Sequence, residues 1–384
     1  TNFIGFLNMD SPMKLPRFFA SSHAPIAFHF HKCPRDFVVQ EEPLYAFYGH
    51  GDHLVVQVRK KNKSTWEMLS LLSQVLGCNI SMFGYAGLKD KHAMTLQYIS
   101  MPRSCEVLLD KHVPMLAEQG ITILRSTAHP HKLRLGHLKG NHFSVRLKKL
   151  DPVSAQKISK VLLFLQAYGF PNYFGAQHFD NFGNSFKRDR TGNKKIDQVL
   201  LSNQQSYLFN QWLSARMRLN ALVQILSPKE IARQCKGLDI KQAQILKAQQ
   251  HYFKLLNGDV LCHYPFGRCF YHYDQDSGQD VERLYTHRLA PTGLLPGHKV
   301  LLAKDVAGSF EELYSGLVDI QGDRRYALVF PTDIAFNYSI QESQGELRFF
   351  LPKGAHATIF LEELAGKELF NPKTSESLLS PLLT

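Results

Sequence analysis

The order in which strand-like and helix-like patterns follow one another is the feature that most constrains the fold of this chain. β-branched runs lie within residues 28–60, and strand patterns return from residue 326 onward. Between them, from about residue 171, apolar residues recur mainly at helical spacing. This order predicts an α+β fold in which a mixed core is interrupted by a largely helical insertion.

Capping and turn residues give the expected limits of several elements. Ser64 with Glu67 three residues later forms a capping-box pattern, and Gly77 can end the helix that begins there. Pro152 starts a second helix, which Gly169 ends. Further helices are predicted at residues 206–219, 228–234, 240–256 and 357–364, and strands at 37–39, 54–58, 95–100, 143–147, 326–330 and 347–351.

One short turn, within residues 84–97, packs small, basic, acidic and polar groups between two apolar segments. Its glycines, among them Gly87, allow the backbone to fold tightly and to approach a ligand. Asp90 lies between Lys89 and Lys91 in the sequence, and two ammonium groups beside a carboxylate favour its ionised form. Such a carboxylate can serve as nucleophile or base. The competing interpretation is a turn aspartate that caps its own backbone, and local composition alone favours that one.

The net positive charge of the chain indicates what class of molecule it binds. A net charge of +12 and a pI near 9.3 favour a polyanion, above all nucleic acid, although many basic soluble proteins bind none. Six widely spaced cysteines without a CxxC pair indicate reduced thiols and a cytoplasmic location. No apolar segment approaches the ~20 residues that a membrane helix needs. Motifs typical of zinc proteases, Walker A loops, dinucleotide sites and nucleophile elbows are missing, so we expect no metal and no nucleotide cofactor.

Short motifs spread over nearly the whole chain resemble, in the same order, those of the TruD family of tRNA pseudouridine synthases. Residues 33–41 resemble the family's Pro-Glu-Asp-Phe-Val-Val-x-Glu entry segment, and residues 84–100 its Gly-x-Lys-Asp-x-x-Ala-x-Thr-x-Gln signature. The series continues at residues 138–143, 171–179, 291–293, 322–325 and 351–358. Because the order and the spacing both agree, chance is a poor explanation of the resemblance.

This resemblance implies a pseudouridine synthase-like core with a central, mostly antiparallel sheet, formed by residues 1–170 and 322–384. A helix-rich insertion domain would occupy residues 171–321. The implied reaction isomerises a uridine of tRNA, at position thirteen of the D arm in bacterial members. The glycosidic bond breaks, the uracil rotates and ribose C1′ rejoins C5 of the base, without metal, cofactor or energy source. The tRNA substrate is the expected partner of a monomeric, cytoplasmic enzyme.

The resemblance also assigns roles to residues. Asp90 matches the family's catalytic aspartate, and the target base would leave its stack to reach it. Phe143 matches a position that stacks on the base, and Asn141 a neighbouring polar position. Lys89 would hold phosphate or tune the carboxylate. The loop's supporting positions are Gly87, Thr95 and Gln97.

Three positions depart from the family's pattern. His356 stands where the family usually has a stacking Phe or Tyr, and imidazole offers less area and can be protonated. His178 replaces an Arg, and Arg35 replaces a Glu. None of these departures affects Asp90, the residue that matches the family's catalytic aspartate.

Two other classes of function stay open on the sequence. A noncatalytic RNA-binding or RNA-folding protein would keep the same cleft for recognition only. A carboxylate-based glycosidase would need a second acid at a matched separation from Asp90. Asp36 or Glu41 could supply that acid, but only if the fold brings one of them close.

Overall fold

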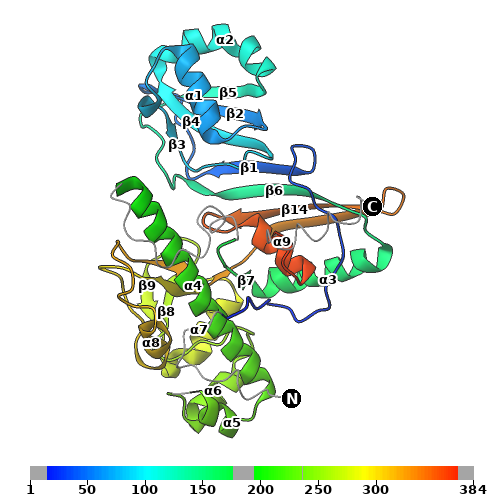
Figure 1. Ribbon diagram of the computed structural model, residues 1–384, viewed down its shortest axis with the longest axis vertical. Helices are drawn as coiled ribbons and strands as arrows, with labels where there is room; N and C mark the ends of the chain where they lie inside the picture. Colours follow the sequence, from blue (N-terminus) through cyan, green and yellow to red (C-terminus); the bar gives the residue numbers. More distant parts are fainter. Residues whose placement is uncertain (1–14, 176–193, 236, 371–384) are drawn as a thin grey trace, which may run out of the picture. The chain divides into compact units, whose positions relative to one another are not determined.

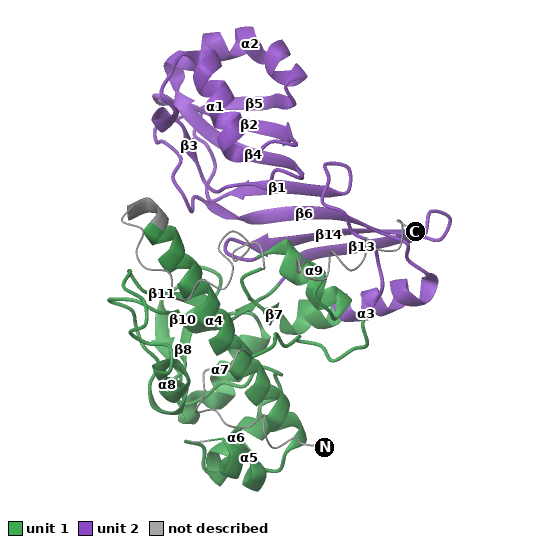
Figure 2. Ribbon diagram, in the orientation of Figure 1, with its two compact units in different colours: residues 1–25, 163–330, 356–384 green, residues 26–162, 331–355 purple. Residues whose placement is uncertain are grey.

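The computed structural model describes residues 15–175, 194–235 and 237–370. The chain divides into two compact units, shown in Figure 2, and each unit combines separate stretches of sequence. We call residues 26–162 and 331–355 the sheet unit, and the described parts of residues 1–25, 163–330 and 356–384 the helical unit. The assignment of residues 171–321 as an insertion domain stays a prediction.

The sheet unit is built on one large sheet with the strand order β13-β14-β6-β1-β4-β2-β5, and β3 pairs with β4 (Figure 1). Strands β1 and β4 run parallel, and the other described pairs in this sheet are antiparallel. The strands are β1 (Phe37–Pro43), β2 (His53–Lys61), β3 (Gly84–Tyr85), β4 (Met94–Pro102), β5 (Ile121–His129), β6 (Leu138–Lys148), β13 (Thr332–Ser339) and β14 (Gln344–Pro352). The helices are α1 (Thr65–Leu76), α2 (Glu106–Glu118) and α3 (Pro152–Tyr168), whose last turns belong to the helical unit. The predicted α+β fold with a mostly antiparallel core sheet is confirmed.

Helices α1 and α2 pack on one face of this sheet. On β2, Leu54, Val56 and Val58 point to that face, because side chains alternate along a strand. They form one buried cluster with side chains such as Leu72 of α1 and Leu116 of α2. The same face of β2 therefore carries an apolar row that continues toward residue 60.

The helical unit contains a small sheet as well as helices. Its four-stranded antiparallel sheet has the order β11-β10-β8-β9, and β7 pairs separately with β12. The strands are β7 (Phe170–Pro171), β8 (Val260–His263), β9 (Cys269–Tyr271), β10 (Leu289–Leu295), β11 (Asp323–Tyr326) and β12 (Leu328–Val329). The helices are α4 (Lys194–Ile225), α5 (Pro228–Gln234), α6 (Ile240–Ala248), α7 (Ser277–Tyr285), α8 (Asp305–Glu312) and α9 (Ala357–Ala365). The sequence did not reveal the small sheet, because its strands are short and β10 contains Pro291 and Gly293, which usually interrupt strands.

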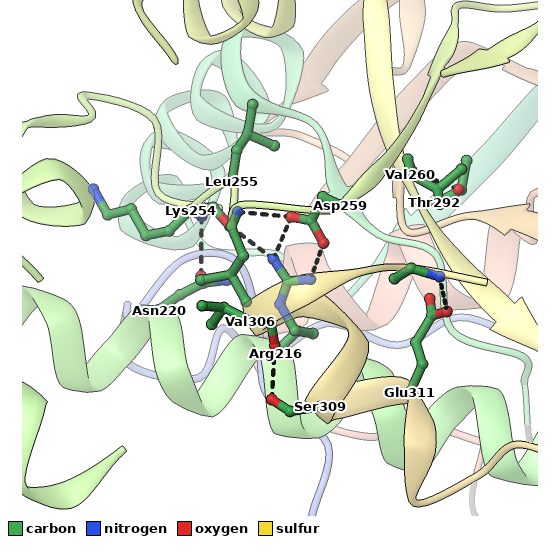
Figure 3. Close-up of polar contacts among 12 residues, drawn as sticks. Arg216, Asn220, Lys254, Leu255, Asp259, Val260, Thr292, Val306, Ser309 and Glu311 are labelled. Atoms are coloured by element: carbon green, nitrogen blue, oxygen red, sulfur yellow. Dashed lines mark hydrogen bonds and ion pairs between the residues drawn. The ribbon is translucent and has the colours of Figure 1, made fainter. Parts of the chain in front are cut away.

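A buried ion pair lies in the interior of the helical unit (Figure 3). Arg216 of α4 binds Asp259 through two bonds, of 2.6 Å from Nη1 to Oδ1 and 2.9 Å from Nη2 to Oδ2. The side chains are only 1% and 3% exposed. Arg216 also donates to the carbonyl of Lys254, and the Leu256 N–H donates to the Asp259 carboxylate. The pair thus ties α4 to the segment that leads into β8.

Most predicted elements are confirmed in type, although their observed limits differ from the predicted ones. The strand predicted at residues 326–330 is wrong as a single strand, because the structure divides this stretch between the end of β11 and β12, which belong to different sheets. The helix predicted at residues 206–219 lies inside the longer α4. The prediction of a helix over residues 240–256 is wrong beyond Ala248, because Gln249 is extended at ψ 126°. The Gln249 amide binds both the N–H and the carbonyl of Leu255, so a side chain satisfies backbone groups that a helix would have paired.

The predicted capping box at the start of α1 is confirmed, and it sets a stability expectation. The Ser64 hydroxyl accepts a bond from the Glu67 N–H at 3.1 Å, and the Glu67 carboxylate accepts from the Ser64 N–H at 2.6 Å. We expect Ser64→Ala to lower the free energy of unfolding by about 1 kcal/mol, because an N–H at the helix end loses its acceptor. Urea denaturation measures the change, and Ser227→Ala at the capping box of α5 is the matched comparison. An unchanged midpoint in Ser64→Ala would contradict the expectation.

Among the described residues, no helix is long and apolar enough to cross a membrane. His178, one of the three departures from the family's pattern, lies outside the described residues.

Candidate active site

The strand register aligns several predicted site residues on one face of the large sheet. Val39 of β1 pairs with Thr95 of β4 on one side and with Phe143 of β6 on the other. Thr95 in turn pairs with Lys60 of β2. Residues directly opposite one another point to the same face, and each strand adds ~4.8 Å, so Lys60 and Phe143 are roughly 14 Å apart in one row. The next row on this face contains Glu41 and Asn141, which pair directly, and Gln97, which is two residues beyond Thr95 on β4.

Asp90 lies in the loop between β3 and β4, and its side chain is exposed. The backbone of this loop is held by hydrogen bonds with Lys60 of β2 and Thr65 of α1. Lys60 Nζ donates to the carbonyl oxygens of Asp90 at 3.2 Å and Lys89 at 3.5 Å. The Lys89 N–H donates to Thr65 Oγ1 at 3.0 Å. These bonds fix the main chain at Asp90 and leave its carboxylate free of described hydrogen bonds, which argues against a turn residue that caps its own backbone.

The two lysines that flank Asp90 in the sequence pair with other carboxylates. Lys89 Nζ lies 2.5 Å from Glu41 Oε2, and both side chains are almost fully buried. Burial raises the pKa of Glu41, and the Lys89 charge opposes that effect. Lys91 Nζ lies 2.7 Å from Glu67 Oε1 at the surface. The placement of Lys89 therefore favours support of the loop over contact with phosphate.

Apart from Glu41 Oε2, which is ion-paired with Lys89, three buried polar atoms on this face have no hydrogen-bond partner among the described residues. They are Thr95 Oγ1, Gln97 Nε2 and Asn141 Oδ1. The other end of the Gln97 amide accepts a bond from Thr65 Oγ1 at 3.0 Å, which fixes its orientation. An unpaired buried polar atom costs about 1–3 kcal/mol. Buried polar atoms are usually hydrogen-bonded, so a group of unpaired ones is expected where a water or a ligand supplies the missing partners.

Phe143 is part of a stack of phenylalanines and is only 7% exposed. Its ring lies 5.2 Å from that of Phe349 and 6.1 Å from that of Phe37, and both neighbours are nearly parallel to it. Its role as a platform for a base stays a prediction, and the ring offers a small open area.

His356 belongs to the helical unit, at the N-terminus of α9. Its ring is tilted against that of Phe174 at 6.1 Å, and the Arg325 guanidinium lies 3.9 Å over the Phe174 ring. Burial lowers the pKa of Arg325 to about 9. His356 therefore sits in an aromatic and cationic setting, and its contact with a base stays a prediction.

Sequence reasoning missed Lys60 and Thr65, although each left a signal. Lys60 continues the alternation of Leu54, Val56 and Val58, so it occupies an inward position where an apolar residue is expected. Because other basic residues neighbour Lys60 in the sequence, it resembled a lysine at the solvent-exposed end of a strand. Thr65 is the first residue of α1, a position that the capping pattern located without indicating a role for its hydroxyl.

Both candidate second acids for a glycosidase are engaged elsewhere. Asp36 pairs with Lys148 and lies 3.7 Å from Arg146. Burial acts to raise the pKa of Asp36, but hydrogen bonds from Lys148 and Cys33 and the nearby positive charges outweigh it and lower that pKa. Glu41 pairs with Lys89. These ion pairs argue against a two-carboxylate glycosidase.

Comparison with known proteins identifies the family. The family model of tRNA pseudouridine synthase D (TruD) matches residues 16–186 and 190–364. The tRNA pseudouridine synthase D of Sulfurimonas denitrificans is 42% identical over 367 residues, which cover 92% of this chain and 100% of that protein. The protein of the same name from Wolinella succinogenes is 41% identical over 364 residues, which cover 92% of this chain and 99% of the relative.

The fold agrees with this result. The crystal structure of a protein assigned to tRNA pseudouridine synthase D from Methanosarcina mazei matches with a TM-score of 0.59. The match covers 92% of this chain and 99% of that one at 19% identity. The chain therefore belongs to the TruD family of tRNA pseudouridine synthases, a family of isomerases.

Proposed function

We propose that this protein isomerises a uridine of tRNA to pseudouridine, with Asp90 as the catalytic carboxylate and position thirteen of the D arm as the target. The observation that carries the proposal is the exposed Asp90 on a fixed loop, above a sheet face with unpaired buried polar atoms. The net charge of +12 suits a polyanionic substrate. The family supports the reaction class.

The chemistry of uracil suits the unpaired atoms. Its pairing edge carries one N–H donor between two carbonyl acceptors, and Asn141 Oδ1 is an acceptor without a described partner. The base would have to leave its stack to reach Asp90, with Phe143 as an aromatic neighbour. The contact of the base with His356, which belongs to the helical unit, stays a prediction from the family resemblance. Asp90 would then either bond covalently to carbon or remove a sugar proton to give a glycal. Lys89, paired with Glu41, would hold the loop together with Gly87, Thr95 and Gln97.

The proposal extends to the organisation of the chain. Residues 1–170 and 322–384 would form the catalytic core, and residues 171–321 the insertion domain. The enzyme would act on tRNA as a monomer in the cytoplasm, without a metal or cofactor. Light scattering of the purified protein with and without tRNA measures its oligomeric state.

The test is direct conversion of a tRNA transcript. We expect incubation with an unmodified transcript to give pseudouridine in the nucleoside digest by mass spectrometry, and a transcript with cytidine at position thirteen to give none. The Sulfurimonas denitrificans relative serves as the positive control. Tight binding of the transcript with no conversion over long incubation, while the control converts it, would instead favour the noncatalytic RNA-binding alternative.

A further inference from the structure

Lys60 is a fully buried lysine at the end of β2. Its ammonium donates to three main-chain carbonyls, those of Lys63 at 2.6 Å, Asp90 at 3.2 Å and Lys89 at 3.5 Å. An ammonium has three hydrogens, so all of its donors are used. Two of the three acceptors belong to the loop that carries Asp90.

We propose that Lys60 is a positioning residue for the isomerisation, which holds the main chain of Lys89 and Asp90 so that the Asp90 carboxylate is presented to the substrate. The inference rests on the proposed function of Asp90. Lys60 acts only through the loop, because it has no exposed surface from which to touch a substrate.

Burying the charge of Lys60 costs free energy, which indicates that this residue has a role beyond packing. Lys60 continues the inward row of Leu54, Val56 and Val58, where an unbranched apolar side chain would avoid burying a charge. Such a side chain could not bind the three carbonyls. Burying the Lys60 charge therefore does not improve the packing of the core, but it allows the ammonium to hold the loop.

The surroundings of Lys60 set the pH range over which it acts. Burial is the largest influence and lowers its pKa, and the Lys89 charge adds to this. The carboxylates of Asp90 and Glu67 oppose it, and the result is a pKa of about 8. Below that pH the ammonium holds the loop with charge-assisted bonds, and above it a neutral amine keeps two donors and no charge.

Activity and stability should then move in opposite directions at alkaline pH. The unfolded chain keeps this proton up to its ordinary pKa of 10.5, whereas the folded protein releases it near pH 8. Between these values the unfolded state binds more protons, so this group makes the fold more stable as pH rises. Titration of Lys60 by itself would therefore lower turnover near pH 8 without destabilising the fold.

The experiment compares three variants of the full chain by steady-state kinetics on tRNA between pH 6.5 and 9.5. Lys60→Met keeps the side-chain length and removes every donor, and Lys60→Arg keeps a charge that does not titrate in this range. Lys254→Met is the matched control. Lys254 is also a buried lysine that binds a carbonyl, that of Gln249, and burial lowers its pKa too, but it lies in the helical unit.

We expect Lys60→Met to lose roughly 100-fold in kcat with an unchanged KM, as a displaced catalytic group would. Lys60→Arg should lose the alkaline fall near pH 8, and Lys254→Met should keep the wild-type kcat. Hydrogen exchange without RNA gives a second measure: amides of residues 87–93 should exchange faster in Lys60→Met than in Lys254→Met.

Wild-type kcat in Lys60→Met, or unchanged exchange at residues 87–93, would overturn the inference. A wild-type protein that makes no pseudouridine would refute the proposed function instead, while the exchange measurement would still decide whether Lys60 holds the loop.

Discussion

Asp90→Asn is expected to bind tRNA with wild-type affinity and to lose turnover by a factor on the order of 10⁴, the loss typical when a catalytic carboxylate becomes an amide. The amide has nearly the same shape, but it is neither an effective nucleophile nor a base. The Asp90 side chain is exposed and has no described hydrogen bond, so the fold should be unaffected. Single-turnover formation of pseudouridine and filter binding of tRNA measure the two properties separately.

The matched control is Asp110→Asn, which makes the same chemical change at an exposed position of α2 in the same unit. It should keep both binding and turnover. If Asp90→Asn also turned over at a near-normal rate, the catalytic role would belong to another group. If it lost binding and turnover together, Asp90 would be a recognition residue.

Arg216→Met is expected to lower the free energy of unfolding by about 3–5 kcal/mol, the range seen when one partner of a buried ion pair is removed. The Asp259 carboxylate would stay buried, with the Leu256 N–H as one remaining donor. Denaturant unfolding followed by fluorescence measures the loss. The chain has two tryptophans, Trp66 in the sheet unit and Trp212 in the helical unit, so a Trp66→Phe background reports on the helical unit alone.

Two further variants show whether the cost comes from the unpaired charge. Replacing both partners, as Arg216→Met with Asp259→Leu, should recover much of the loss, because no buried charge is then left alone. Arg103→Met breaks an exposed pair with Glu106 and should cost at most about 1 kcal/mol. Equal effects of Arg216→Met and Arg103→Met would show that burial of the Arg216 pair is energetically unimportant.

Local sequence signals predicted the limits of elements well. The capping box at Ser64 and the left-handed Gly77 at the end of α1 are present as expected. Each of these signals acts within one helical turn, so the residues concerned are neighbours in the chain. The same holds for the Asp90 loop, whose composition already set it apart.

The predicted limits or types of elements were wrong where contacts outside the local sequence pattern decide the structure. The end of α6 depends on the Gln249 amide, which binds backbone six residues away. The strands of the small sheet depend on partners that their own patterns do not indicate. In both places local propensity was overridden by contacts that form only in the folded chain.

The sequence by itself determined the α+β class, the family and the identity of the candidate catalytic residue. Only the tertiary structure showed that Lys60, Thr95 and Phe143 share one row, and that Lys89 pairs with Glu41 and not with Asp90. Strand register brings together residues that lie tens of positions apart, and it follows from which strands become neighbours. A buried lysine such as Lys60 can be understood only when the carbonyls that bind it are known, because its burial is tolerable only with those partners.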